Sequence, residues 1–237
     1  MIKKISATIM LSLLFASGAQ AACKIVNSGL QNKTIYAGEK NPMIVSNIQQ
    51  AGKVLADTLV TPQEISLQTH IDLEKVLFVC DESDKDKLYE LAYRPYGWAD
   101  NATPAYSENK IQFFKTSAVG VYFQFFLGEG SEYEFLPYKT MKKISSSPSV
   151  TQPNKIEVKL KDFSGVRNLQ IRSDNMNVPN GEQTIAGVSR GIVAFIGPGI
   201  NDNLNNSSGV ITASPVGESY LNVAQYPAKV KLDQCAQ

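Results

Sequence analysis

The histidine, cysteine and carboxylate residues decide which chemistries this chain can support. Its 237 residues include a single histidine, His70. A Ser-His-Asp or Cys-His arrangement needs an imidazole to take the proton of the nucleophile, and the usual zinc sites need histidines or paired cysteines. His70 stands between Leu67 and Ile71 in an alternating pattern typical of a strand, so we expect a structural role for it. We therefore expect no catalytic residue, no metal site and no cofactor.

The acidic run at 81–87, DESDKDK, has some of the oxygen ligands of a calcium loop. Lys85 and Lys87 interrupt those ligands, so we expect a solvated loop here. The sequence leaves open whether two carboxylates pair across the fold, as in glycoside hydrolysis, because such pairing is spatial rather than sequential. A periplasmic or secreted hydrolase that uses dispersed carboxylates is therefore one alternative function.

The segment Tyr93–Tyr106, YRPYGWADNATPAY, combines aromatic residues with acid and amide groups and contains the single tryptophan. Aromatic rings stack on the C–H faces of sugars, while carboxylate and amide oxygens accept hydrogen bonds from sugar hydroxyls. We therefore predict that this loop binds a ligand through Tyr93, Tyr96, Trp98, Asp100 and Asn101. The alternative is that Trp98 and Tyr96 only fasten a long loop to the body of the protein.

The first 21 residues predict a cleaved export signal. Two lysines precede the apolar run Ile5–Phe15, and residues 19–21, Ala-Gln-Ala, place small side chains at the −3 and −1 positions. The run is shorter than the roughly 20 residues that cross a bilayer, and no later segment reaches that length, so we expect no membrane span. The chain is nearly neutral and has no basic block, which argues against nucleic acid as a partner.

Three cysteines, Cys23, Cys80 and Cys235, follow the predicted signal. In an oxidising compartment they predict one disulfide and one remaining thiol. A Cys23–Cys80 bond would close a loop of about 57 residues and stabilise the fold by about 4 kcal/mol in the chain-entropy model. Cys235 could instead pair with Cys80 if Cys23 carried a lipid. The spacing leaves both pairings open, and our expectation is Cys23–Cys80.

Hydrophobic periodicity predicts an all-β protein. Within the apolar run Ile111–Leu127, residues 119–127 alternate, and the second face is also partly apolar, which predicts a central strand that is covered on both sides. Residues 61–80 predict two further strands, and Ile48–Asp57 predicts a short helix. Short strands separated by turn residues follow at 155–161, 166–172, 191–196, 210–213, 220–224 and 228–232. Their spacing predicts a β-sandwich or barrel.

The proline- and serine-rich segment at 145–154, SSSPSVTQPN, predicts a linker or a long loop. We therefore divide the chain into a signal peptide at 1–21, a β-rich amino-terminal region at 22–144 that could bind a receptor, this linker, and a β-rich carboxyl-terminal region at 155–237. The sequence leaves open whether these regions make one large domain or two small ones.

Taken together, these features resemble subunits of chaperone–usher pili from Gram-negative bacteria. The matching parts are Cys23 directly after the signal, the strand end Val79-Cys80, the segment Gly120–Phe125, which is similar to a Gly-Val-Gly-Ile-Gln type of strand, and the alternating strand Tyr226–Leu232. The resemblance implies an immunoglobulin-like sandwich, which in this family can lack its last strand and be completed by a donor strand from a neighbour.

The resemblance also implies a position and partners. Subunits of the shaft carry an alternating segment before their first cysteine, whereas only Ala22 stands there in the predicted mature chain. We therefore expect a non-enzymatic tip adhesin at the cell surface, exported through the periplasm. Its expected partners are a periplasmic pilus chaperone, an outer-membrane usher, other pilus subunits, and a host receptor that is a glycan or a protein. A stand-alone periplasmic binding or structural protein is a second alternative.

Overall fold

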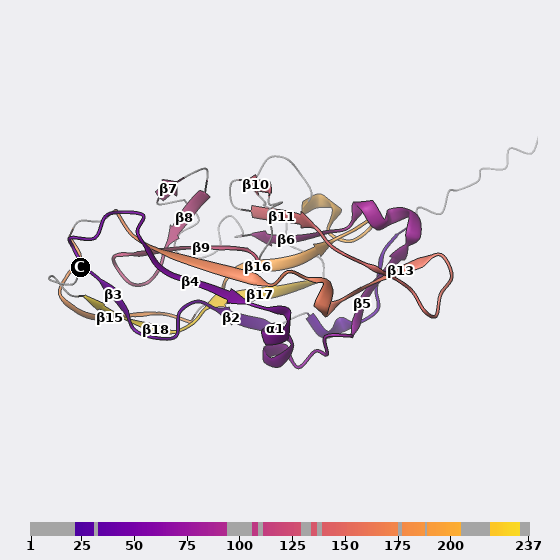
Figure 1. Ribbon diagram of the computed structural model, residues 1–237, viewed down its shortest axis with the longest axis horizontal. Helices are drawn as coiled ribbons and strands as arrows, with labels where there is room; N and C mark the ends of the chain where they lie inside the picture. Colours follow the sequence, from indigo (N-terminus) through magenta and orange to yellow (C-terminus); the bar gives the residue numbers. More distant parts are fainter. Residues whose placement is uncertain are drawn as a thin grey trace, which may run out of the picture.

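The structure is a computed structural model, and Figure 1 shows an elongated molecule built almost wholly of strands. It describes residues 22–30, 33–93, 106–108, 111–128, 134–136, 139–174, 177–187, 189–204 and 219–232. The prediction of an all-β fold is confirmed.

One layer is a six-stranded sheet in the order β10-β11-β6-β16-β17-β2. Its strands are β10 (Glu134–Leu136), β11 (Lys139–Lys143), β6 (Tyr89–Tyr93), β16 (Ser189–Ile196), β17 (Tyr220–Gln225) and β2 (Thr34–Ala37). Neighbouring strands are antiparallel except β17 and β2, which run parallel. The edge strand β2 therefore lies beside a strand that is far from it in sequence.

The opposite layer is an antiparallel five-stranded sheet in the order β4-β14-β9-β8-β7. Its strands are β4 (Val54–Val60), β14 (Val166–Arg172), β9 (Val121–Leu127), β8 (Ile111–Lys115) and β7 (Tyr106–Glu108). All seven residues of β9 are buried, and β9 pairs with strands on both sides. The prediction of a central strand covered on both faces is confirmed for residues 121–127, whereas residues 111–115 form the separate strand β8 and a turn at 116–120 joins the two.

Two smaller sheets extend the molecule at its ends, as Figure 1 shows. One contains β1 (Lys24–Ile25), β5 (Val76–Asp81), β13 (Lys155–Lys159) and β12 (Ser147–Pro148). The other contains β15 (Gly181–Ile185), β18 (Ala228–Leu232) and β3 (Met43–Val45). The helices are short: α1 (Pro62–Thr69), η1 (Ser28–Leu30), η2 (Glu82–Lys87), η3 (Leu160–Asp162) and η4 (Asp202–Leu204).

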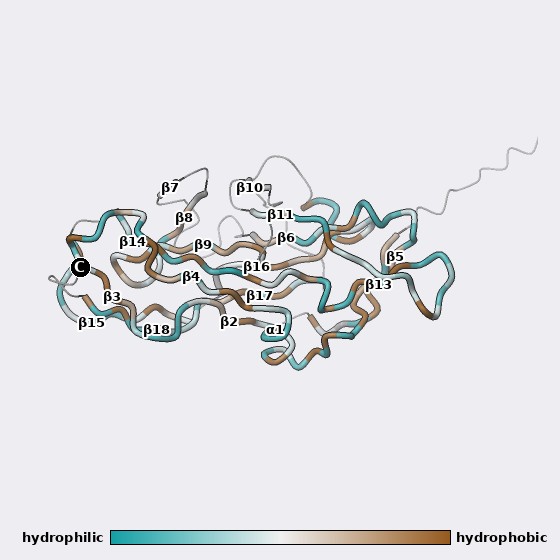
Figure 2. The backbone as a smooth tube through the Cα atoms, viewed as in Figure 1, coloured by the Kyte–Doolittle hydropathy of each residue, from teal (hydrophilic) through white to brown (hydrophobic). Residues whose placement is uncertain are grey.

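The core lies between the two large sheets, which makes the fold a β-sandwich. Phe123 and Phe125 of β9 belong to the same buried cluster as Val193 and Phe195 of β16. Phe78 of β5 stacks on Phe195 with 4.0 Å between the ring centroids, so the cluster continues into the end sheet. Most hydrophobic segments of the backbone run along the inner strands in Figure 2, whereas the outer loops are largely hydrophilic.

Strands from the regions 22–144 and 155–237 pair with each other in all four sheets. The segment 145–154 between these regions contains β12, which pairs with β13. The two regions therefore share one sandwich within the described residues.

The last strands have neighbours on both sides. β17 lies between β16 and β2, and its continuation β18 lies between β15 and β3. The position beside the last strand, which the family resemblance leaves open for a donor, is thus occupied by β2 and β3 of the chain itself.

One predicted strand and one predicted helix are wrong. The predicted strand through Ile65, Leu67 and Thr69 is the helix α1, because Thr61 and Glu64 form a capping box and Pro62 stands in the first turn. The predicted helix at 48–57 is a turn followed by β4. Gly52 adopts a positive φ of 82° there, and the next residues pair with β14. Tertiary pairing overrides a weak helical pattern at this point.

Candidate functional site

The predicted ligand-binding residues lie at the margin of the described structure. Tyr93 is the last residue of β6, where its backbone is paired with Lys139 and Ile192. The other four residues of that prediction, Tyr96, Trp98, Asp100 and Asn101, lie outside the described residues, so the aromatic loop stays a prediction.

His70 is not in a strand. It ends α1 in a left-handed conformation with φ 59°, and its backbone N–H donates to the Ser66 carbonyl oxygen at 2.8 Å. Its side chain is exposed. Within the part of the chain that the structure describes, His, Cys, Asp and Glu side chains form no group that could hold a metal ion.

The acidic run at 81–87 is not a simple solvated loop. Asp81 ends β5, residues 82–87 form the helix η2, and Asp84 within this helix is buried. Lys87 Nζ donates to Asp84 Oδ1 at 2.7 Å and compensates the charge of this carboxylate. This ion pair lies within η2, whereas Lys143 Nζ of β11 lies 3.6 Å from Asp86 Oδ1 and so links the segment to the six-stranded sheet.

The predicted disulfide Cys23–Cys80 is confirmed. Both half-cystines are buried, and the Cys23 N–H also donates to the Pro198 carbonyl oxygen at 2.7 Å. The bond fixes the chain just before β1 to the strand β5 across a sequence separation of 57 residues. It thereby ties the start of the described chain to the middle of an end sheet.

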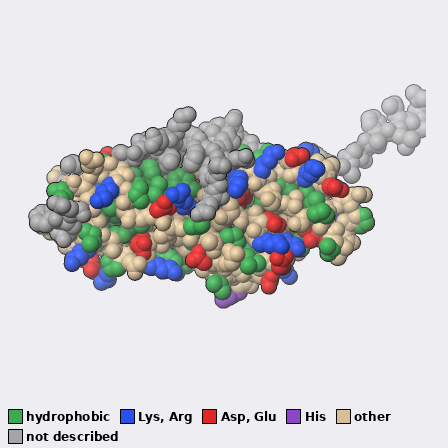
Figure 3. All heavy atoms as spheres, in the orientation of Figure 1, with side chains coloured by type: hydrophobic (Ala, Val, Ile, Leu, Met, Phe, Trp, Pro, Cys, Tyr) green, Lys and Arg blue, Asp and Glu red, His purple; other side chains and the backbone are tan. Residues whose placement is uncertain are grey.

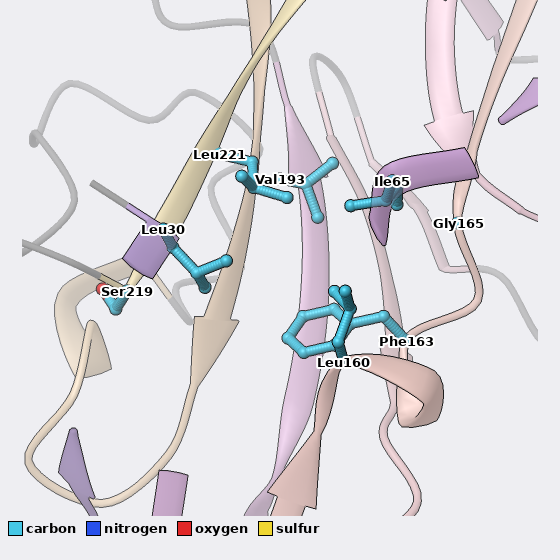
Figure 4. A pocket seen from close by; sticks show the side chains of 8 residues that line it. All are labelled: Leu30, Ile65, Leu160, Phe163, Gly165, Val193, Ser219 and Leu221. Carbon is cyan, nitrogen blue, oxygen red and sulfur yellow. The ribbon is translucent and has the colours of Figure 1, made fainter. Parts of the chain in front are cut away.

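An internal pocket, shown in Figure 4, lies under α1 between Ile65, Phe163, Val193 and Leu221. Its volume is about 10 Å³ and its walls are apolar. Such a space is at the lower limit for one water molecule, whereas sites for small-molecule ligands have volumes of about 300–1,000 Å³. It is a packing defect of the core rather than a ligand site.

A larger groove opens where the edges of the two large sheets meet. β2 is the outer strand of the six-stranded sheet, β4 is the outer strand of the five-stranded sheet, and both contact α1. The groove between them has a volume of about 270 Å³. We call it the seam groove. The residues that line it include 58–60 of β4 and Tyr36, Glu39, Lys40, Glu64, Gln68 and Tyr226.

Two tyrosines make the aromatic wall of the seam groove. The ring centroids of Tyr36 and Tyr226 are 5.6 Å apart, and the ring planes are tilted by 54°. Lys40 Nζ lies 4.6 Å from the centroid of the Tyr226 ring, which is a cation–π contact. Tyr36 is 36% exposed, so an aromatic surface is open to solvent here.

Two carboxylates border the same groove, and each also shapes the backbone. Glu39 Oε1 accepts from the backbone N–H groups of Lys40 and Asn41 at 2.9 and 2.8 Å. Glu64 Oε2 accepts from the Thr61 N–H at 2.8 Å and so completes the capping box of α1. Among the residues that the structure describes, the bonds that hold each carboxylate in place therefore involve one of its two oxygens.

Gln68 of α1 closes the outer edge of β2. Its Oε1 accepts from the Tyr36 N–H at 2.7 Å, and its Nε2 donates to the Tyr36 carbonyl oxygen at 3.2 Å. One side-chain amide thus satisfies both backbone groups that a further strand would use at this residue. The helix both orders the groove and protects the sheet edge.

Buried amides support the loop after β2. Gly38 has φ +126°, and a Cβ atom there would lie 3.0 Å from Asn168 Nδ2 and 3.1 Å from Gln225 Oε1. Asn168 Nδ2 donates to Gln225 Oε1 at 3.0 Å, and Gln170 Oε1 accepts from the Glu39 N–H at 3.3 Å. A residue without a side chain is required at 38 so that the loop can lie on these amides.

Sequence reasoning missed the seam groove because its parts are distant in the chain. The parallel pairing of β2 and β17 aligns Tyr36 with Ala224 and brings Tyr226 beside the loop after β2. The capping box at Thr61 and Glu64 was a readable local signal for α1, but no local pattern links position 36 with position 226.

Several solved structures are similar in fold to this chain, and two of them are described here. The receptor binding domain of the plasmid-born adhesin MrkD1P of Klebsiella pneumoniae is 13% identical with a TM-score of 0.46, covering 92% of this chain and 99% of that one. The Proteus mirabilis Ambient Temperature Fimbriae adhesin AtfE is 12% identical with a TM-score of 0.41, covering 85% of this chain and 99% of that one. No family model matches the chain, and no curated protein matches it.

Proposed function

We propose that this protein is an exported, non-enzymatic adhesin at the tip of a fimbrium, where it binds a host receptor that is a glycan or a protein. The sequence supports this function through its predicted export signal and its resemblance to pilus subunits. The structure adds the β-sandwich and the disulfide Cys23–Cys80 that suits an oxidising compartment.

One observation carries the proposal. The sandwich is closed beside its last strands, while a groove with aromatic and charged walls stays open at its edge. A receptor-binding domain needs a finished fold with an open site, and the described part of the chain has both.

On the face drawn in Figure 3, acidic and basic side chains lie interspersed. None of the helices in the described residues is both long and apolar enough to cross a membrane. We extend the proposal to a periplasmic chaperone, an outer-membrane usher and neighbouring pilus subunits as partners during export and assembly.

The test uses the mature chain, residues 22–237, purified with its disulfide intact. It should be a folded monomer without any chaperone, and it should bind host cells or extracellular matrix in a saturable manner. Antibody labelling of bacteria should place it at the ends of surface fibres.

Labelling at regular intervals along the fibre shaft would refute the tip position. Failure of the folded protein to bind any cell, matrix protein or glycan would refute the adhesin function. Catalytic cleavage of a bound receptor glycan would instead favour the hydrolase alternative.

A further inference from the structure

We propose that the seam groove binds one uncharged sugar ring of a glycan, an inference that rests on the proposed adhesin function and gives it a site. The argument uses four features of the groove: the free polar atoms, the aromatic wall, the size and the charge.

Each of the two carboxylates at the groove has one oxygen that can still accept a hydrogen bond from a ligand. Glu39 makes its hydrogen bonds through Oε1 and Glu64 through Oε2. Within the described part of the chain, Glu39 Oε2 and Glu64 Oε1 have no hydrogen-bond partner. A carboxylate oxygen accepts well from a hydroxyl group, and a sugar ring offers several hydroxyls in fixed directions. The bonds through the other oxygens hold both carboxylates in position before a ligand arrives, which lowers the entropic cost of binding.

The aromatic wall suits the other side of a sugar. Lys40 occupies one approach to the Tyr226 ring, whereas the Tyr36 ring is more than one-third exposed. A pyranose ring has a face of C–H bonds that packs on an aromatic face, while its hydroxyls point outward. Tyr36 can receive that C–H face while the carboxylates accept from the hydroxyls.

The volume and the charge of the groove further restrict the class of ligand that can bind. The volume of about 270 Å³ is just below the range of about 300–1,000 Å³ for the sites of drug-sized ligands. This space suits one ring rather than an extended oligosaccharide. The charged groups on the walls are Glu39, Glu64 and Lys40, so the groove has an excess of one negative charge. An anionic sugar would meet repulsion at the two carboxylates.

The groove does not suit an added peptide strand. The N–H and C=O groups of Tyr36 already bond to the side chain of Gln68. A peptide could pair with β2 at this residue only after it displaced that amide. The sugar hypothesis needs no such rearrangement, because its contacts use groups that are free.

The experiment compares two matched pairs of probes by NMR titration of the mature chain. The pairs are methyl glucoside with methyl glucuronide, and methyl galactoside with methyl galacturonide, each as both anomers. At least one neutral member should bind, and its uronide should bind about threefold more weakly at low salt, with a smaller difference at 0.5 M salt.

Two variants test the walls. Tyr36→Ala removes the exposed ring but keeps the backbone bonds to Gln68, and it should weaken sugar binding about tenfold. Glu39→Gln keeps a carbonyl oxygen for the loop but replaces the free oxygen by an N–H donor, and it should also weaken binding about tenfold. The matched control is Glu182→Gln on β15, whose carboxylate pairs with Lys229 at the surface and lies outside the groove. It should bind as the wild type does.

The inference is overturned if the neutral sugar binds equally well to both groove variants, or if the uronides bind as tightly as the neutral glycosides. Loss of binding in Trp98→Ala with full binding in Tyr36→Ala would place the site in the loop after β6 instead. If the mature chain binds cells but none of the probes, the groove proposal fails and the adhesin proposal stands. If it binds neither, both fail.

Discussion

Glu90 is the buried acid whose replacement should change how stability depends on pH. It lies on β6 with 1% of its surface exposed, and it accepts from the Ser164 N–H at 2.9 Å and from the Ser164 hydroxyl at 2.5 Å. Burial raises the pKa of Glu90 from its ordinary value of 4.5 to about 7, although the bonds from Ser164 and the charge of Lys142 act in the opposite direction. The carboxyl group joins the six-stranded sheet to the chain that leads into β14.

The sign of the effect follows from the raised pKa. Below pH 4.5 the carboxyl group is protonated in the folded and the unfolded chain alike, so its contribution to stability is fully present. Between pH 4.5 and 7 the unfolded chain releases this proton while the folded chain keeps it, and stability is lost as pH rises. A rise of the pKa from 4.5 to about 7 corresponds to a loss of about 3 kcal/mol.

The assay is urea unfolding of the mature wild type and of Glu90→Gln at several pH values from 4 to 8. Glutamine keeps an oxygen that accepts from the Ser164 N–H but does not titrate. The stability of the wild type relative to this variant should therefore fall by about 3 kcal/mol over that range. The stability of Glu182→Gln, a variant at an exposed position, should change with pH in the same way as that of the wild type. A difference between wild type and Glu90→Gln that stays constant with pH would refute the reasoning.

Three further changes test other parts of the structure. Cys80→Ser should lower the free energy of unfolding by about 2–5 kcal/mol, and a reductant should then have no additional effect on thermal unfolding; unchanged stability would contradict the role of the disulfide. Gln68→Ala removes two hydrogen bonds to the Tyr36 backbone and should cost about 1–3 kcal/mol, with faster hydrogen exchange at the Tyr36 amide; an amide that stays protected would show that the edge is closed by other groups. Trp98→Ala should abolish receptor binding without changing the melting temperature if the aromatic loop binds ligand, whereas a large fall in melting temperature would assign Trp98 to packing.

The sequence by itself determined the elements whose signal is local. The alternation through β9 and β18 follows from the period of two along a strand, which needs no knowledge of the partner strands. The number and position of the cysteines restricted the disulfide to a few pairings. The all-β class followed from many such short segments, each of which can be read within its own window.

The predicted secondary structure was wrong where different features of the sequence favoured different structures. Residues 61–69 alternate like a strand, but Thr61, Pro62 and Glu64 start a helix, and the side-chain bonds of the capping box decide the outcome. Residues 48–57 contain good helix formers, but residues 54–57 pair with β14 and therefore form the first part of β4, after a turn.

Only the tertiary structure decided the seam groove and the closure of the sandwich. Tyr36 and Tyr226 are 190 positions apart, and they meet because β2 pairs in parallel with β17. The register of such a pair depends on which apolar side chains fill the core between the sheets. These packing contacts involve residues that are far apart in the sequence, so neither strand alone shows a pattern that predicts the register. The same pairing puts β2 and β3 beside the last strands, where the resemblance to pilus subunits had implied an open position.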